Sequence, residues 1–175
     1  MSVRPGSIRV GQGFDVHPWS EDDDGGLVLG GIRFPEHRGL RGHSDGDAIA
    51  HACTDAVLGA AGLGDIGQLF PDTDAALAGA DSVDLLAQAV AVVRRAGWAV
   101  ANIDCTVVCD SPKIGPVRDE MIRILSGAAG APVTVKGKRT EGVDALGQGI
   151  QAFAVAMVVR DENGSSEEGA TGGTT

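Results

Sequence analysis

One segment near the end of the chain constrains the fold more than any other. Residues 150–159 read IQAFAVAMVV, and apolar side chains fill both alternating sets of positions. Successive side chains of a strand point to opposite faces, so a strand here is apolar on both faces and requires cover on both. A chain of 175 residues has few helices to spare. We therefore expect a helix layer on one face of the sheet and subunit association on the other.

The remaining strands and helices do not alternate strictly. Periodicity and turn residues predict further strands over 8–17, 27–34, 100–110 and 132–138, and helices over 46–62, over 82–96 and from 112 or 116 to about 125. Ser44 or Asp45 is the expected cap of the first helix and Ser82 that of the second. Residues 20–26 are expected to form an exposed turn, and 35–45 and 64–81 to form loops. The expected fold class is α+β, with a single mixed β-sheet and helices packed on one face.

Composition and charge limit the classes of function. Apolar residues make up 43 % of the chain, but no apolar run approaches the roughly 20 residues that span a bilayer. The first ten residues lack the apolar core of a signal peptide, which indicates a cytoplasmic protein without membrane contact. No basic stripe with interleaved aromatic residues occurs and Tyr is absent, so nucleic-acid binding is not expected.

The net charge of −10 is unevenly distributed. Residues 21–24 contribute four negative charges and residues 161–168 contribute four more, which leaves −2 for the rest of the chain. An anionic ligand is therefore compatible with the sequence. We expect one domain over residues 1–160 and an acidic disordered tail over 161–175. Cys53, Cys105 and Cys109 fit no disulfide or metal-binding pattern and are expected to be small buried thiols.

A metal site is suggested by GFDVHPW at residues 13–19. In a strand, Asp15 and His17 project to one face while the apolar residues beside them point to the other. His51 on the first predicted helix adds a second imidazole, and two imidazoles with one carboxylate suit tetrahedral zinc with an open fourth position. Asp47, one helical turn earlier, is expected to accept the other N–H of His51. The alternative is a chance strand pair and a solvated helix face.

Longer motifs carry a family resemblance. GFDVHPW, LGGIRFP, GLRGHSDGDAIAHACTDAVLGAAGLGDIGQLFPDTD and GADS form a nearly continuous match over about 10–82, and VVCDSPKIGP and VKGKRTEG extend it. On these motifs the chain resembles the 2-C-methyl-D-erythritol 2,4-cyclodiphosphate synthase family of non-mevalonate isoprenoid biosynthesis. The resemblance covers about residues 8–160. It implies homotrimers whose sheet faces meet, with active sites between subunits. It also implies conversion of 4-diphosphocytidyl-2-C-methyl-D-erythritol 2-phosphate to the cyclic diphosphate with release of CMP.

The same resemblance assigns roles to individual residues. It implies one tetrahedral zinc ion per chain on Asp15, His17 and His51, and a magnesium or manganese ion on Glu141 that bridges the substrate diphosphate. His43 is the implied catalytic histidine. Residues 70–74 match a loop that closes over the methylerythritol, and residues 109–115 match the cytosine pocket of a neighbouring subunit. The implied substrate contacts are Asp15, His17, His43, Ser44, Asp65, Ile66, Gly67, Phe70, Asp74, Cys109, Lys113, Thr140 and Glu141.

Two departures from the family pattern leave alternatives open. Arg139 stands where the family carries a threonine that resembles a transition-state stabiliser, and a charge-assisted bond from arginine could take that catalytic role. The segment 143–151 is shorter than in the family pattern, and Gln148 falls near the position of a family arginine. In family members this region lines a cavity on the trimer axis that can hold an isoprenoid diphosphate. A cyclase is the leading hypothesis. The alternatives are a non-catalytic trimer that binds metal and cytidine nucleotides, and a purely structural domain.

Overall fold

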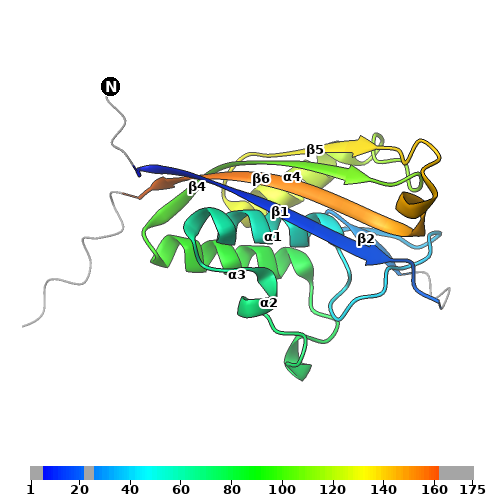
Figure 1. Cartoon of the computed structure of the whole chain (residues 1–175), viewed down its shortest axis with the longest axis horizontal. Coiled ribbons are helices and arrows are strands. Elements are labelled where there is room, and N and C mark those ends of the chain that lie inside the picture. Colours follow the sequence, from blue (N-terminus) through cyan, green and yellow to red (C-terminus); the bar gives the residue numbers. More distant parts are fainter. Residues whose placement is uncertain (1–5, 22–25, 162–175) are drawn as a thin grey trace, which may run out of the picture.

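A four-stranded sheet forms one layer of the protein, and the helices lie on one side of it (Figure 1). The computed structural model describes residues 6–21 and 26–161. The strand order is β1–β6–β4–β5, with β1 at Ile8–Pro18, β6 at Gly149–Arg160, β4 at Trp98–Val108 and β5 at Val133–Lys138. β6 runs antiparallel to both of its neighbours, whereas β4 and β5 are parallel. The predicted mixed sheet and α+β class are confirmed.

The prediction of a single sheet is wrong for residues 27–34. There β2 (Leu27–Leu29) and β3 (Ile32–Phe34) pair only with each other, in a separate two-stranded sheet. Gly30 and Gly31 make the turn with φ of 59° and 76°, a left-handed conformation that glycine adopts without steric cost. The side chain of Asp47 accepts both of their N–H groups, at 2.9 and 2.7 Å, and so fixes this hairpin to the start of α1.

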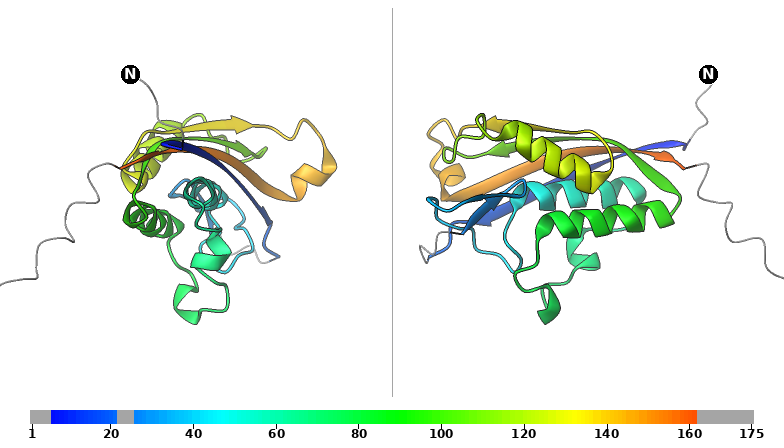
Figure 2. Two further views of the ribbon diagram at one scale, coloured as in Figure 1. Left: turned by 60° about the vertical axis from the view of Figure 1, so that its left-hand side comes forward. Right: turned by 180° about the vertical axis from the view of Figure 1, so that it is seen from behind.

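The three longer helices cover one face of the large sheet, which curves over them in Figure 2. They are α1 (Ala48–Ala61), α3 (Ser82–Arg95) and α4 (Arg118–Ala129). α1 lies against β1 and β6, and it approaches β1 closely because two β1 residues on that face are glycines. A Cβ on Gly13 would lie 2.0 Å from the carbonyl oxygen of Ala52. The sequence therefore brings the middle of α1 directly onto the strand that carries Asp15 and His17.

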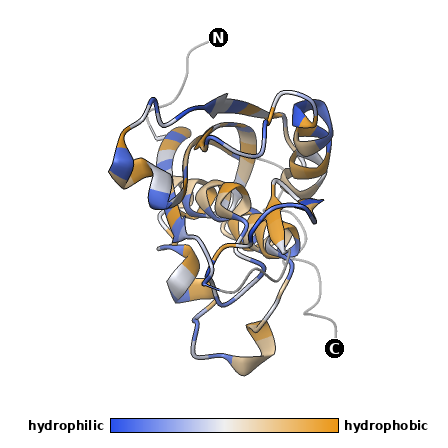
Figure 3. Cartoon of the chain, turned by 90° about the vertical axis from the view of Figure 1, so that its right-hand side faces the viewer, coloured by the Kyte–Doolittle hydropathy of each residue, from blue (hydrophilic) through white to orange (hydrophobic). Residues whose placement is uncertain are grey.

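The two faces of β6 differ in cover. Ile150, Ala152, Ala154, Ala156 and Val158 are buried beneath the helices, as predicted. On the opposite face Phe153 is 44 % exposed and pairs with Phe14 of β1, the two ring centroids lying 4.9 Å apart. Hydrophobic and hydrophilic residues both occur along the helices (Figure 3). α1 is buried at 12 of its 14 residues, whereas α3 and α4 bury one side each. Within one chain, the second face of the sheet therefore stays apolar and exposed along β1 and β6, whereas β4 and β5 carry the polar Asp104, Thr134 and Lys136.

The helix caps differ from those predicted. Asp47, not Ser44 or Asp45, caps α1, because its carboxylate accepts the N–H groups of Ile49 and Ala50. Asp81 likewise caps α3 in place of Ser82, which is the first helical residue. α4 continues four residues beyond the predicted end and stops before Gly130, which has φ of 61°.

The segment predicted as a loop over 64–81 contains two short helices. α2 (Ile66–Leu69) is capped by Asp65, and the 3-10 helix η1 (Ala75–Leu77) is capped by Asp74. Another 3-10 helix, η2 (Asp144–Gln148), occupies the shortened segment before β6 and holds Trp19 through the carbonyl of Gly147 at 3.1 Å. These elements are too short to show a periodicity in the sequence.

Some predictions concern residues outside the described ranges. The tail predicted over 161–175 lies outside the described residues except for Asp161, whose N–H donates to the carbonyl of Gly97 at 3.1 Å. The turn predicted over 20–26 includes residues 22–25, which the structure does not describe. Among the described helices, none is both long enough and apolar enough to cross a membrane. Cys53, Cys105 and Cys109 are buried and free, which confirms their interpretation as buried thiols.

Candidate metal centre and substrate pockets

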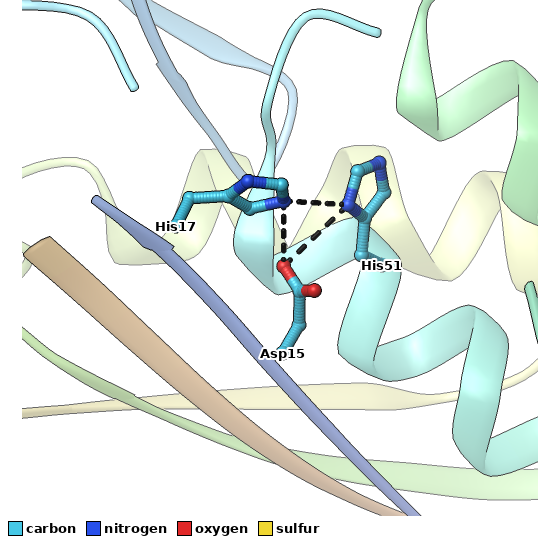
Figure 4. Close-up of side chains that lie close together, drawn as sticks. All are labelled: Asp15, His17 and His51. Atoms are coloured by element: carbon cyan, nitrogen blue, oxygen red, sulfur yellow. Dashed lines mark hydrogen bonds and ion pairs between the residues drawn. The ribbon is translucent and has the colours of Figure 1, made fainter. Parts of the chain in front are cut away.

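Three predicted metal ligands meet between β1 and α1 (Figure 4). Asp15 and His17 project from alternate positions of β1 toward the helix layer, and His51 projects from the first turn of α1. Asp15 Oδ2 lies 3.0 Å from His17 Nε2 and 3.5 Å from His51 Nδ1, and the two ring nitrogens lie 3.1 Å apart. Within the described residues this is the one cluster of histidine, cysteine and carboxylate groups with metal-site spacing.

The geometry of this cluster fits a tetrahedral cation. Metal–ligand bonds of about 2.0–2.1 Å in a tetrahedron place neighbouring ligand atoms about 3.3 Å apart, close to all three observed separations. Asp15 Oδ2 is buried and accepts no hydrogen bond of regular geometry. The Nδ1–H of His17 donates to the carbonyl of Arg41 at 2.9 Å. In the neutral ring, Nε2 therefore points a lone pair toward Asp15 Oδ2. A buried carboxylate oxygen facing imidazole lone pairs is an arrangement that a cation stabilises.

In the metal-free cluster, the electrostatics favour an ionised Asp15 and a protonated His17. Burial raises the pKa of Asp15, but in acid the protonated rings of His17 and His51 can donate to the carboxylate and add positive charge, which together lower this pKa to about 2. Burial likewise disfavours the charged form of His17, yet the neighbouring Asp15 raises the His17 pKa above its usual value. The carboxylate is therefore ionised near neutral pH, as a metal ligand must be.

The predicted role of Asp47 is wrong. Its carboxylate is fully buried and is occupied by the backbone N–H groups of the β2–β3 turn and of α1. The Nε2 atom of His51 instead lies 3.0 Å from Ser44 Oγ and 2.9 Å from Ser82 Oγ. The four-residue spacing of Asp47 and His51 placed both on α1, but the start of the helix required the aspartate as its cap.

A cavity of about 420 Å³ opens beside the cluster, and we call it the metal-side cavity. Its lining residues are Asp15, His17, His43, Ser44, His51, Ile66, Gly67, Phe70, Asp72, Leu77 and Leu85. Asp55 of α1 positions α2 at its rim by accepting the N–H of Ile66 at 2.7 Å. His43 Nε2 donates to the carbonyl of Asp74 at 3.1 Å, which ties the segment before η1 to the same rim. The lining combines the polar groups of the cluster, His43 and Ser44 with the apolar side chains of Ile66, Phe70, Leu77 and Leu85.

A second pocket of about 270 Å³ lies between the loops that follow β4 and β5, and we call it the basic pocket. Its lining residues are Cys109, Asp110, Pro112, Lys113, Ile114, Gly115, Arg118, Gly137, Lys138 and Arg139. Thr140 joins the two loops by donating its hydroxyl to Asp110 Oδ2 at 2.5 Å and its N–H to Oδ1 at 3.2 Å. These bonds lower the pKa of Asp110. Burial raises the pKa of Cys109 to about 11, so this thiol is not a nucleophile.

Comparison with known proteins decides the family. The sequence profile of the YgbB family matches residues 8–159. The chain belongs to the YgbB family. The 2-C-methyl-D-erythritol 2,4-cyclodiphosphate synthase of Aromatoleum aromaticum is 52 % identical over 158 residues, which is 87 % of this chain and 94 % of that relative. The synthase of Rubrobacter xylanophilus is 48 % identical over 161 residues, covering 89 % of this chain and 97 % of the relative.

Solved structures agree with this YgbB assignment. A CDP-bound 2C-methyl-D-erythritol-2,4-cyclodiphosphate synthase superposes with a TM-score of 0.77 at 38 % identity, over 86 % of this chain and 99 % of that one. The bifunctional IspDF of Campylobacter jejuni gives a TM-score of 0.79 at 38 % identity, over 87 % of this chain and 42 % of that one. The mixed sheet with its helix layer is therefore the fold of YgbB proteins.

The structure sorts the site residues predicted from the YgbB resemblance into two groups. His43, Ser44, Ile66, Gly67 and Phe70 share the metal-side cavity with the three candidate ligands. Cys109, Lys113 and Arg139 line the basic pocket instead. Their individual roles stay predictions.

Four predicted residues line neither pocket. Thr140 joins the two loops of the basic pocket through its hydrogen bonds to Asp110. Asp65 and Asp74 each cap a short helix at the rim of the metal-side cavity. Glu141 is exposed beside Thr140, adopts a φ of 53°, and does not join the three-residue metal cluster.

Several lining and supporting residues were not among those predicted from the sequence. Leu77 and Leu85 add apolar side chains to the lining of the metal-side cavity, and Arg118 adds a cation to the basic pocket. Leu85 follows the matched motif GADS by three residues, so the sequence could have placed it on the first turn of α3, close to the other site residues. Asp110 lies inside the matched motif VVCDSPKIGP, but its bond to Thr140 joins loops 30 residues apart and has no local signature.

Proposed function

We propose that the protein catalyses an intramolecular phosphoryl transfer. It converts 4-diphosphocytidyl-2-C-methyl-D-erythritol 2-phosphate to 2-C-methyl-D-erythritol 2,4-cyclodiphosphate and CMP, in non-mevalonate isoprenoid biosynthesis. The observation that carries this proposal is the cluster of Asp15, His17 and His51 at the mouth of a cavity of about 420 Å³. Relatives 52 % identical over 87 % of the chain bear the name of this synthase.

The reaction requires positioning and charge neutralisation rather than a side-chain nucleophile. An oxygen of the 2-phosphate attacks the β-phosphorus, the bond from that phosphorus to the bridging oxygen breaks, and CMP leaves with the electron pair. Asp15, His17 and His51 would hold a zinc ion, which as a Lewis acid would polarise phosphoryl oxygens. His43 and Ser44 lie beside these ligands, in position to bind a phosphate. Ile66, Phe70, Leu77 and Leu85 offer an apolar surface to the carbon chain and limit the access of water.

The basic pocket is proposed to bind the cytidine nucleotide. Lys113, Arg118, Lys138 and Arg139 provide positive charge for phosphates. CDP is the ligand in solved structures of a 2C-methyl-D-erythritol-2,4-cyclodiphosphate synthase and of the Plasmodium falciparum IspF. Glu141, which follows this pocket in the chain, is proposed to hold a magnesium or manganese ion, which would offset negative charge on the substrate diphosphate. Arg139 is proposed to donate to a phosphoryl oxygen in place of the family threonine.

A homotrimer would complete the site. In one chain the proposed phosphate and nucleotide groups line different pockets, so a neighbouring subunit is needed to bring them to one substrate. The uncovered sheet face offers the contact surface, because Val10 is 65 % exposed, Phe14 46 % and Val155 46 %. An apolar face of this kind is typical of an obligate interface. The cytoplasmic location expected from the sequence, and the binding of an isoprenoid diphosphate on the trimer axis, stay predictions.

The test is release of CMP from the cytidine substrate by zinc- and magnesium-loaded protein. Asp15→Ala and His51→Ala are expected to abolish release, because each removes a proposed ligand. A matched control is Arg123→Ala, since Arg123 pairs with the exposed Glu120 on α4, outside the metal cluster and both pockets. Unchanged turnover in either ligand variant would contradict the proposal.

The alternative function, a non-catalytic binder of metal and cytidine nucleotides, draws on Arg139 and the shortened segment that forms η2. Calorimetry with CDP beside the turnover assay separates the two functions. Tight CDP binding without cyclic product would favour the binder, whereas cyclic product formation excludes it.

A further inference from the structure

The second ring nitrogen of His51 faces a closed set of hydrogen bonds that the proposed reaction does not use. We propose that Ser82 and Asp45 form a relay that fixes His51 in the tautomer and orientation required of a metal ligand. This inference rests on the proposed metal site and concerns how that site is built. Both are positioning residues in this account, because they act through His51 and contact no substrate.

The direction of each hydrogen bond follows from counting protons. The hydroxyl of Ser82 donates its single proton to Asp45 Oδ1 in a very short contact, and the backbone N–H of Ser82 donates to Asp45 Oδ2 at 3.2 Å. Toward His51 the Ser82 oxygen can therefore only accept. The 2.9 Å contact then requires that His51 carry its proton on Nε2. Its Nδ1 is left with a lone pair aimed at the carboxylate of Asp15, 3.5 Å away.

Ser82 and Ser44 have different roles in this cluster. Ser82 is fully buried, and its proton is committed to Asp45. Ser44 lies 3.0 Å from His51 Nε2 and 3.2 Å from Ser82 Oγ, and it lines the metal-side cavity. Its hydroxyl can donate to Ser82 or turn toward a ligand in the cavity. Ser82 is thus the fixed partner of His51, and Ser44 is the one free to serve a substrate.

Asp45 is itself held in place by the backbone. Its N–H donates to the carbonyl of Ala80 at 3.1 Å, and its Oδ1 accepts the N–H of Asp47 at 3.1 Å. The relay therefore ties the first residue of α3 to the cap of α1 and, through His51, to the metal cluster. Partners of this kind orient histidine ligands, and their loss typically lowers metal affinity about 10- to 100-fold.

The test measures zinc affinity directly, by competition with a chromophoric chelator after the protein has been stripped of metal. Ser82→Ala is expected to weaken zinc binding about 10- to 100-fold, and Asp45→Asn to weaken it less, because an amide retains one acceptor oxygen. Ser126→Ala is the matched control, since Ser126 on α4 accepts the N–H of Val133 at 3.0 Å far from the cluster in the chain. Its zinc affinity is expected to stay at the wild-type value.

A second readout does not depend on bound metal. Nitrogen-15 NMR of the His51 ring in the metal-free protein is expected to show a protonated Nε2 in the wild type and a mixture of tautomers in Ser82→Ala. Ser82→Thr, which keeps the hydroxyl, is expected to restore the wild-type spectrum. A purely structural role of Ser82 would not produce this pattern.

The outcomes separate the relay from the metal site. Wild-type zinc affinity and an unchanged His51 tautomer in Ser82→Ala would overturn the relay while leaving the metal site intact. A larger loss of affinity in Ser44→Ala than in Ser82→Ala would also overturn it, because Ser44 would then be the partner of His51. Failure of the wild type to bind zinc would overturn both proposals.

Discussion

Replacing Gly13 with alanine tests whether the close contact of β1 and α1 builds the site. Gly13 lies two residues before Asp15, on the strand face that carries both β1 ligands. Its added Cβ would lie 2.0 Å from the carbonyl oxygen of Ala52 and 2.7 Å from the backbone nitrogen of Ala56. Both contacts are with helix backbone, which cannot turn aside as a flexible side chain can.

The size of the effect follows from these distances. Ordinary contact begins near 3.4 Å, so strand and helix must separate by about 1.4 Å at Ala52. Overpacking of this kind costs about 1–3 kcal/mol of unfolding free energy. His51 directly precedes Ala52, so the same displacement widens its 3.5 Å separation from Asp15. Metal sites tolerate deviations of only about 0.2 Å in ligand distance, and we expect a large loss of zinc affinity.

Urea unfolding of the metal-free protein and zinc competition measure the two effects separately. The matched control is Gly59→Ala on the exposed side of α1, where the nearest atom to a new Cβ is Gln12 O at 3.9 Å. The unfolding free energy of this control is expected to rise by about 0.5–1 kcal/mol, because alanine stabilises a helix interior relative to glycine. If Gly13→Ala matched the wild type in both stability and zinc affinity, the close packing of α1 on β1 would not define the site.

Three further predictions concern separate features of the molecule. In the metal-free protein the depressed pKa of Asp15 stabilises the fold above pH 3.8 by about 2 kcal/mol, and this is lost as the pH falls toward about 2. Acid unfolding monitored by circular dichroism should therefore show a smaller loss over this range in Asp15→Asn, and an equal loss would refute the assignment. Phe14→Glu places a charge on the uncovered sheet face and is expected to break the proposed homotrimer, so that the mass in analytical ultracentrifugation falls from that of three chains to that of one. A wild type that sediments as one chain, or a variant that keeps the mass of three, would contradict this interface. Thr140→Val removes the hydroxyl that lowers the pKa of Asp110. That pKa is expected to rise in an NMR titration and CMP release to fall, whereas an unchanged pKa would show that the contact does not persist in solution.

The parts of the site that follow local periodicity could be predicted from the sequence. Asp15 and His17 share a strand face because they are two residues apart, and His51 lies on a helix that the apolar stripe and Gly62 delimit. The burial of one face of β6 followed from its apolar composition. These features depend on period and composition, which the sequence shows directly.

The parts that depend on competition between side chains could not be predicted. Four aspartates near the site each cap a helix, namely Asp47, Asp65, Asp74 and Asp81. A shift of the helix start by one or two residues would make a different residue the cap, and the sequence does not show where each helix begins. Ser82 was expected to cap α3 but lies inside it, where its hydroxyl reaches His51, 31 residues away in the chain. Long-range contacts of this kind follow from how α1 and α3 pack, not from either segment alone.

The central claim is that Asp15, His17 and His51 hold one divalent cation. Zinc content per chain, measured by mass spectrometry after loading and removal of excess metal, tests it most directly. We expect one zinc per chain in the wild type and in Arg123→Ala, and none in His51→Ala. Retention of a full equivalent of zinc by His51→Ala, or absence of zinc from the wild type, would contradict the claim.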